Sequence, residues 1–569
     1  MTGLRGSRHS RLRVGAFLLF CLVLDGCSWP GDGPATPAAI ASAHPLATQA
    51  GMEILTAGGN AFDAAVAVTA VLAVVGPHGS GLGGGGFWLL HRESDGLDVM
   101  IDGRERAPLA ATRDMYLDDN GDVVPGLSVN GALAAGIPGE PAALVHIAER
   151  YGRLPISHTL EPAIRIAREG FTTNAQYNRL ARFRLADLQN DPETARIFLQ
   201  DDELPQPDYL IRQPELAATL EAISLHGKTG FYRGEIAVKL VDGVRRAGGI
   251  WSLDDLEQYE VVERAPVTGN YRGMRIVSAA LPSSGGVVLL SMLNILGGFP
   301  LDTLDVPTRT HVIIEAMRRA YRDRAGYLGD PDFHDMPVAR LTSAAHADRQ
   351  RESIRLDRAT PSQDKEGAGS VSGGMNTTHF SILDSEGNRV AATLSVNYPF
   401  GACFMPTGTG VLLNNEMDDF SAKPGVPNLY GLVGAEANAI APGKRPLSSM
   451  SPTFVEHEDG VAILGTPGGS RIITMVLLGI LDMADGALPQ SWVSRPRFHH
   501  QYLPDVVQYE TNAFDVDLVD TLQSMGHTLQ ALDTDYGNMQ AIYHDRKNGQ
   551  VFAASDPRGV GLSAVSVID

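Results

Sequence analysis

Residues 376–397 read NTTHFSILDSEGNRVAATLSVN, and this stretch predicts a β-hairpin. Residues 377–384 and 389–397 have the composition of strands. Between them, Ser385-Glu386-Gly387-Asn388 is typical of a turn. The polar residues 352–375 come just before the hairpin and have the composition of a mid-chain linker, the kind of segment in which proteolytic cleavage concentrates.

The hairpin brings polar side chains to its first residue. With the two strands flanking the turn directly, Thr377 pairs with Val396, to within about one residue. Ser395 and Asn397 then lie on either side of that pair. We therefore expect a threonine hydroxyl at the start of a strand, surrounded by polar groups from its partner.

Two interpretations fit the tetrapeptide Asn376-Thr377-Thr378-His379. It is either an ordinary strand start, which also happens to match a glycosylation sequon, or the site of a self-activating nucleophile. In the second case Thr377 Oγ attacks its own preceding carbonyl, and hydrolysis of the resulting ester frees the threonine α-amine. With a pKa of roughly 8, that amine serves as a built-in general base for the hydroxyl beside it.

Both helices and strands are predicted before the hairpin. Residues 61–75 are almost wholly apolar and predict a buried helix. Residues 87–91 and 97–102 predict two strands joined by a turn. Further helices are expected at 47–55, 141–151, 214–225 and 308–327.

The glycine-rich segment 79–86 contains a G-x-G-x-x-G match. A dinucleotide site requires a strand before the glycines and a helix after them, whereas here a helix precedes and a strand follows. We therefore expect a close-packed backbone turn beneath the reactive site. No Lys-Ser/Thr follows to make a phosphate-binding loop.

Charged residues follow predicted strands at two places. Arg104 could clamp a carboxylate in a bidentate manner, or simply form a surface ion pair with Glu105. The segment 414–421 (NNEMDDFS) concentrates acids and amides that could hold an ammonium group or a divalent metal. No histidine completes a metal site there, so we favour the ammonium. We interpret His499-His500 as structural, because it has no partner at metal-ligand spacing.

Hydroxyls and glycines mark two later turns. Ser448 and Ser449 follow Lys444-Arg445 and would suit a carboxylate. Gly468 and Gly469 precede a predicted helix at 472–483, and amides at a helix N-terminus can form an oxyanion hole. On local grounds alone, the interpretation as a pair of ordinary turns is favoured for both segments.

Composition and the N-terminus limit the classes of function. The 569 residues carry a net charge of −20, which argues against nucleic acid as a partner. Residues 1–27 resemble a signal peptide ending in Leu-Asp-Gly-Cys, which predicts lipidation of Cys27; simple cleavage and an uncleaved anchor are the alternatives. We expect a linker at 28–43 and a periplasmic or envelope-anchored protein. Outside the signal, Cys403 is the only cysteine, and we expect it to be buried.

Several ordered blocks together resemble the γ-glutamyltranspeptidase (glutathione hydrolase) family of N-terminal nucleophile hydrolases. The resemblance runs from about residue 43 to the C-terminus. Its blocks are the glycines at 79–86, DGRERAP at 102–108, PSSGG at 282–286, YLGDP at 327–331, the threonines at 377–378, NNEMDDFS at 414–421, PLSSMSPT at 446–453 and PGGSR at 467–471.

This resemblance implies an α+β fold, a four-layer αββα sandwich cleaved between Asn376 and Thr377. The products would be a large subunit, 44–376, and a small catalytic subunit, 377–569, which stay together as a heterodimer. Glutathione and other γ-glutamyl compounds would be the substrates, with water or an amino acid or dipeptide as acceptor. The resemblance implies no metal and no cofactor.

Matching position by position implies a role for each site residue. Thr377 would be the nucleophile and Ser395 its hydrogen-bonding partner, Arg104, Ser448 and Ser449 would bind the α-carboxylate, Asn397, Glu416 and Asp419 would hold the α-amine, Gly468 and Gly469 would form the oxyanion hole, and Tyr430 would belong to a lid loop at 424–438. Relatives often have threonine in the place of Ser395, and some have glutamine in the place of Glu416. Tyr398-Pro399 departs from the family pattern and leaves the acceptor side open.

Two other functions are compatible with these residues. A cephalosporin (glutaryl) acylase resembles the same family and uses the same kind of nucleophile, but a glutaryl chain has no α-amine for Asn397, Glu416 and Asp419 to hold. A non-catalytic, lipid-anchored glutamyl-binding protein would have kept the pocket and lost turnover. Self-cleavage separates this last possibility from the others.

Overall fold

The computed structural model describes residues 37–362 and 377–568, and within them strands β9 (Thr377–Leu383) and β10 (Arg389–Ser395) form the predicted hairpin. The register differs from the expected one by a single residue. Thr377 pairs with Ser395, and Val396 lies just beyond the pairing. The expected uncertainty of about one residue covers this difference.

The hairpin loop explains the shift. The amide of Asp384 donates to the carbonyl of Asn388 at 3.0 Å, so these two residues form the last pair. The loop is therefore three residues long, not four, and Gly387 adopts φ +94° within it. Three-residue hairpin loops commonly place a glycine in this left-handed conformation. The Asp384 carboxylate accepts hydrogen bonds from the amides of Glu386 and Asn388 and holds the loop closed.

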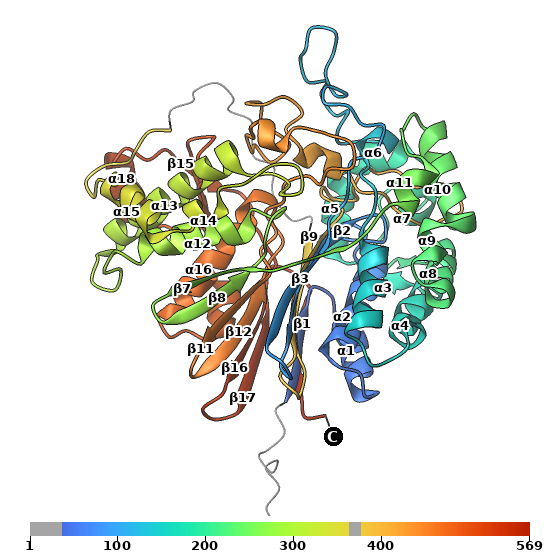
Figure 1. The fold of residues 1–569 in the computed structure, drawn as a ribbon, viewed down its shortest axis with the longest axis horizontal. Helices are drawn as coiled ribbons and strands as arrows, with labels where there is room; N and C mark the ends of the chain where they lie inside the picture. Colours follow the sequence, from blue (N-terminus) through green and yellow to red (C-terminus); the bar gives the residue numbers. More distant parts are fainter. Residues whose placement is uncertain (1–36, 363–376, 569) are drawn as a thin grey trace, which may run out of the picture. The chain divides into compact units, whose positions relative to one another are not determined.

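Two large sheets form the centre of the described chain (Figure 1). Within the described residues, the first sheet has seven strands in the order β18-β1-β9-β10-β2-β3-β6. Besides β9 and β10, its strands are β1 (Ala38–Ser42), β2 (Gly85–Arg92), β3 (Leu97–Gly103), β6 (Val262–Arg264) and β18 (Leu562–Ser566).

The second sheet has six strands within the described part of the chain, in the order β17-β16-β12-β11-β8-β7. These are β7 (Val267–Tyr271), β8 (Met274–Ser278), β11 (Thr453–His457), β12 (Gly460–Gly465), β16 (Gln540–Asp545) and β17 (Gln550–Ser555). Buried side chains from both sheets, including Phe87, Leu89, Phe454 and Ile463, form the layer between them. Stacked sheets of this kind bury the inward-facing residues of each strand.

Helices cover the outer face of each sheet, on the right and the left of Figure 1. The first helical layer packs on the sheet that contains β9; it includes α1 (Pro45–Thr56), α2 (Ala61–Val75), α3 (Glu140–Arg150), α4 (Ile156–Glu169), α5 (Ala175–Phe183), α8 (Pro214–His226) and α10 (Gly234–Arg246). The second layer includes α12 (Gly285–Leu296), α13 (Val306–Tyr327), α15 (Ala344–Glu352), α16 (Ile472–Ala484), α17 (Pro489–Ser494) and α18 (Val516–Ser524). The four layers confirm the predicted αββα sandwich.

Helix α2 shows why these residues become a core element. All fifteen of its residues are buried, because it packs against α1, α3 and α4 on one side and strands β9 and β10 on the other. Asn60 caps its first turn by accepting hydrogen bonds from the amides of Phe62 and Asp63. The helix supports the strand that carries Thr377.

The glycine run ending in β2 packs as tightly as the sequence predicts. A Cβ on Gly83 would lie 2.0 Å from the Leu412 carbonyl oxygen, and one on Gly84 would lie 2.1 Å from that of Ser395. Only glycine allows these backbones to approach so closely. The run therefore fixes the segment that follows β10, beside the end of the hairpin.

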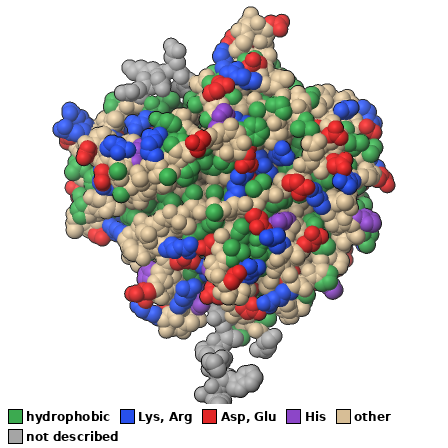
Figure 2. All heavy atoms as spheres, viewed as in Figure 1, with side chains coloured by type: hydrophobic (Ala, Val, Ile, Leu, Met, Phe, Trp, Pro, Cys, Tyr) green, Lys and Arg blue, Asp and Glu red, His purple; other side chains and the backbone are tan. Residues whose placement is uncertain are grey.

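Acidic and basic side chains are interspersed on the face shown in Figure 2. The Asp and Glu residues are likewise spread along the sequence. No helix in the described residues is both long and apolar enough to span a membrane. Cys403 is buried as expected, and burial raises the pKa of its thiol to about 12.

Candidate active site

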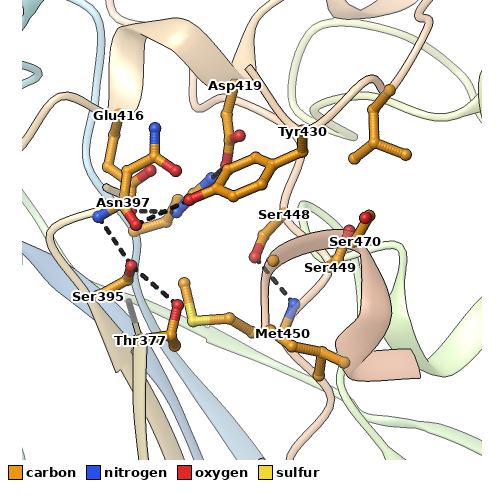
Figure 3. A pocket seen from close by; sticks show the side chains of 14 residues that line it. Thr377, Ser395, Asn397, Glu416, Asp419, Tyr430, Ser448, Ser449, Met450 and Ser470 are labelled. Atoms are coloured by element: carbon orange, nitrogen blue, oxygen red, sulfur yellow. Dashed lines mark hydrogen bonds and ion pairs between the residues drawn. The ribbon is translucent and has the colours of Figure 1, made fainter. Parts of the chain in front are cut away.

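A pocket of about 300 Å³ opens at the start of β9 (Figure 3). It brings together nearly all the residues to which the sequence assigned a role. The predicted residues that line it are Arg104, Thr377, Ser395, Asn397, Glu416, Asp419, Tyr430, Ser448, Ser449 and Gly469. Gly468 precedes Gly469 directly but does not line the pocket. Leu432, Met450, Ser470 and Ile472 complete its wall.

The hydroxyl of Thr377 faces a chain of polar groups on the neighbouring strand. Its Oγ lies 3.3 Å from Ser395 Oγ, within hydrogen-bonding distance. Ser395 Oγ in turn accepts a hydrogen bond from the Asn397 amide at 2.8 Å. Asn397 lies two residues beyond the end of β10 and has φ +70°, a conformation that asparagine tolerates better than most residues. The strand end thus fixes Ser395 beside the hydroxyl of Thr377.

Ser395→Ala is expected to slow self-cleavage by about tenfold or more, because the Thr377 hydroxyl loses its hydrogen-bonding neighbour and the buried Asn397 amide loses its acceptor. Ser395→Thr keeps a hydroxyl at the same place and is expected to mature at a rate close to wild type. Band intensities on a denaturing gel, followed over time after expression, measure the rate. Equal rates for wild type and Ser395→Ala would contradict the role of this contact.

Arg104 is the centre of the ionic part of the pocket. Its side chain is 1% exposed, and its guanidinium lies 2.8 Å from Glu416 Oε1 and 2.5 Å from Asp419 Oδ2. Glu105, also buried, is farther away at 3.7 Å. The structure therefore excludes the surface ion pair between Arg104 and Glu105. It places Arg104 among carboxylates that line the same pocket.

Burial and the charge of Arg104 shift the pKa values of the surrounding carboxylates in opposite directions. Burial raises the pKa of Glu416, although Arg104 acts in the opposite direction. Burial also raises the pKa of Asp419 and brings that of Glu105 to about 8. Apart from Arg104, no described group donates a hydrogen bond to either oxygen of Glu416. Such carboxylates would gain from a ligand that brings a cation with hydrogen-bond donors.

Ser448 and Ser449 lie across the pocket from Glu416 (Figure 3). Arg324, from helix α13, donates to Ser449 Oγ at 3.2 Å and to Ser284 Oγ at 2.9 Å. Arg324 is buried and places a second positive charge behind the hydroxyls. Sequence reasoning missed this residue because no motif marks an arginine in the last turn of a helix.

The glycine pair stands at the entry to helix α16. Gly468 has φ +146° and Gly469 has φ +57°, both of which favour glycine. Among the described residues, neither of their amides donates a hydrogen bond. Unused amides beside a nucleophile are what an oxyanion hole requires.

The segment at 424–438 covers the pocket through Tyr430. The Tyr430 hydroxyl donates to the Asn397 carbonyl at 2.8 Å, and its ring lies against Gly469, where a Cβ would come within 2.7 Å of it. Asp418 accepts a hydrogen bond from the Leu429 amide at 3.1 Å and so anchors the segment to the acidic loop. These contacts place Tyr430 in the wall of the pocket, and the role of the segment as a lid stays a prediction.

The histidines lie elsewhere. His499 is hydrogen-bonded to Thr474 and His500 to Asp505, and burial lowers their pKa values to about 3 and about 4. Among the described residues, two other groups gather possible metal ligands, His311-Glu315-His527 and His91-Asp98-Glu456. Arginines already occupy the carboxylates of Glu315 and Glu456.

Comparison with known proteins agrees with this arrangement. The family model described as Gamma-glutamyltranspeptidase matches residues 47–566. The chain belongs to the γ-glutamyltranspeptidase family. It is 46% identical to the glutathione hydrolase proenzyme of Pseudomonas sp. (strain A14) over 493 residues, which cover 86% of this chain and 85% of that protein.

Two further known proteins are similar to this chain. The glutathione hydrolase proenzyme of Escherichia coli (strain K12) is 42% identical over 529 residues, covering 92% of this chain and 90% of the relative. A solved cephalosporin acylase from Bacillus halodurans has a TM-score of 0.82 at 27% identity, covering 95% of this chain and 99% of the other. The γ-glutamyltranspeptidase fold is therefore shared with an acylase, and the fold alone does not decide the substrate.

Three predicted features lie outside the described residues. These are the signal peptide, the lipidation site Cys27, and Asn376 on the upstream side of the cleavage site. The large and small subunits, 44–376 and 377–569, stay predictions. The predicted linker at 28–43 is wrong over its last residues, because Ala38–Ser42 form strand β1 of the central sheet.

Proposed function

We propose that this chain is a γ-glutamyltransferase and glutathione hydrolase that cleaves itself between Asn376 and Thr377. One observation carries the proposal: the Thr377 hydroxyl shares a single pocket with a buried cation, Arg104, and two carboxylates paired with it, Glu416 and Asp419. This combination of charges matches the α-amino acid end of a γ-glutamyl group.

The proposed reaction is acyl transfer through a covalent intermediate. Thr377 Oγ attacks the γ-carbonyl carbon, and its proton passes to the α-amine that self-cleavage exposes. The Gly468 and Gly469 amides stabilise the oxyanion. The carbon–nitrogen bond then breaks, the leaving amine takes the proton, and a γ-glutamyl ester of Thr377 remains. Water converts this ester to glutamate, and an amine acceptor converts it to a new γ-glutamyl amide.

The charges of the pocket support the binding of a zwitterion. Arg104 is neutralised by Glu416 and Asp419 before the substrate binds. An α-carboxylate can replace these acids on Arg104 and reach Ser448 and Ser449. The α-ammonium then pairs with the displaced acids, helped by Asn397. The net charge of the pocket stays balanced, so little electrostatic free energy is lost on binding.

A glutaryl group lacks that ammonium. It would take Arg104 and leave the carboxylates of Glu416 and Asp419 buried without a cation. We therefore expect the protein to hydrolyse γ-glutamyl anilide with a kcat/KM at least about 100-fold above that for glutaryl anilide. The release of the anilide chromophore from both compounds by purified, matured protein measures this ratio.

The control in this assay is the maturation state of the sample. Protein that has split into two bands yet turns over glutaryl anilide better than γ-glutamyl anilide would favour the cephalosporin acylase alternative. Protein that stays one band and turns over neither compound would favour the non-catalytic binding alternative.

We further propose that the protein is exported and that its two subunits remain associated after cleavage. The basic and apolar N-terminus with Leu-Asp-Gly-Cys at 24–27 supports a lipid anchor on Cys27 in the bacterial envelope. The pairing of β1, from before the cleavage site, with β9 and β18, from after it, supports a stable heterodimer.

A further inference from the structure

A second pocket adjoins the wall of the nucleophile pocket. It is open to solvent and encloses about 1020 Å³, with walls from α5, from the turn after β10 and from the segment that follows β15 (Leu529–Leu532). Apolar side chains, among them Leu180, Phe183 and Pro399, line much of it. The proposed mechanism makes no use of this space.

Two segments of chain form walls of both pockets. Ser470 and Ile472 line the nucleophile pocket, and Arg471 between them lines the second one. On the other segment, Asn397 lines the first pocket and Pro399 the second. The two pockets therefore lie on different sides of these two segments.

Aromatic rings continue this connection. The ring of Phe183 lies 5.6 Å from that of Tyr398, and Tyr398 lies 6.3 Å from Tyr430 over the nucleophile. Phe183 itself is 58% exposed. A line of aromatic rings thus runs from the exposed Phe183 to Tyr430 in the wall of the nucleophile pocket.

Arg471 lies in this second pocket in an unusual electrostatic state. It is 2% exposed, and its guanidinium donates to the Gln508 side-chain oxygen at 2.7 Å, while its Nε has no partner. Within the described part of the chain, no carboxylate pairs with it. The other arginines among the largest fully buried side chains, Arg104, Arg184, Arg389 and Arg497, each pair with a carboxylate.

A buried cation without an anion is costly, because it has lost water and gained no opposite charge. Burial lowers the pKa of Arg471, which agrees with the cost of burying its charge. Its guanidinium lies 4.7 Å from the centre of the Tyr536 ring, whose hydroxyl is buried and also lacks a partner. Glu510 contributes charge from a distance but is already paired with Arg558 at 2.6 Å. The pair therefore offers a cation and a hydroxyl to an incoming anion.

We propose that Arg471 and Tyr536 bind the terminal carboxylate of the peptide on the leaving-group side of the scissile amide. This inference rests on the proposed function. Because transfer to an acceptor is the reverse of acylation, the leaving dipeptide and an acceptor dipeptide occupy the same side of the acyl carbon. One subsite therefore serves the cysteinylglycine end of glutathione and the acceptor.

The rest of the second pocket fits such a peptide. Leu180, Phe183 and Pro399 offer apolar contact to its side chains. Arg179, Asp533 and Asp535 also line the pocket but are exposed, so solvent and salt screen their charges. The buried guanidinium is screened much less and dominates the recognition of a carboxylate.

The test compares glutathione with its C-terminal glycine amide, which differs only by the lost carboxylate. The wild type is expected to prefer glutathione in kcat/KM, chiefly through KM. In Arg471→Gln and in Tyr536→Phe, the ratio of kcat/KM for glutathione to that for the amide should fall, by about tenfold or more in Arg471→Gln. A transfer assay with glycylglycine and glycylglycine amide as acceptors shows whether the same loss holds for the acceptor.

Arg389→Gln is the matched control, because Arg389 is equally buried and also lies over an aromatic ring, Phe454, at 5.2 Å. It should keep the wild-type ratio. An unchanged ratio in Arg471→Gln would overturn this inference, and if that variant does not fold, an unchanged ratio in Tyr536→Phe would do so. Failure of the proposed function gives a different result, since the wild type would then not turn over γ-glutamyl anilide.

Discussion

Thr377→Ala is expected to yield a single uncut chain that turns over γ-glutamyl anilide at least roughly 10⁴-fold more slowly than the wild type. The hydroxyl is the only proposed attacking group for both reactions, and it lies 3.3 Å from Ser395 Oγ at the start of β9. Removing it therefore abolishes the nucleophile and, through the failed cleavage, the α-amine. A denaturing gel and an anilide assay on the same preparation measure both losses.

Thr377→Ser provides the matched control, since it keeps a hydroxyl at the same backbone position. We expect it to split and to retain measurable turnover. The neighbouring Thr378→Ala removes a hydroxyl whose Oγ has no hydrogen-bond partner and is expected to mature. A Thr377→Ala protein that still split between residues 376 and 377 and hydrolysed the anilide would refute the assignment.

Arg104→Gln is expected to lower kcat/KM for γ-glutamyl anilide by about 100-fold or more, chiefly through a higher KM. The substrate loses the partner of its α-carboxylate. Before substrate binds, Glu416 and Asp419 in this variant also lack the cation that lies 2.8 Å and 2.5 Å from them in the wild type. Steady-state kinetics over a wide range of substrate concentration separate KM from kcat.

Arg106→Gln is the control for this change. Arg106 lies two residues away on the same segment, donates to the backbone carbonyl of Gly443 at 2.7 Å, and does not line the pocket. Its substitution should leave KM within about twofold of wild type. Thermal unfolding of both variants shows whether they are folded. An Arg104→Gln protein with an unchanged KM would contradict the proposed clamp.

Local patterns predicted most of the fold. The almost wholly apolar run at 61–75 is helix α2 to the residue, because a helix that is apolar on nearly every side has to be buried. The hairpin was predicted, but its register depended on whether the loop held three residues or four. That choice was decided by Gly387 in a left-handed conformation, which the sequence shows only as a glycine in a turn.

The site was predictable where motif residues carry it and not where packing does. Thr377, Arg104 and Ser449 stand in motifs that resemble the family, and the pocket joins them. Arg324 reaches Ser449 from the last turn of α13, where no recognisable motif marks it. The isolation of Arg471 was equally invisible, because a missing carboxylate leaves no mark in the sequence.

The interleaving of strands across the cleavage site determines how the matured protein can refold. The central sheet places β10 and β9, from after residue 376, between β2 and β1, from before it. The proposed cleavage would turn one chain into two, so a matured molecule that unfolds has to find its other half again, at a rate that depends on concentration. The fold is thus assembled as a single chain, in the precursor. After maturation, an unfolded molecule can regain the fold only by a bimolecular reaction between its two chains.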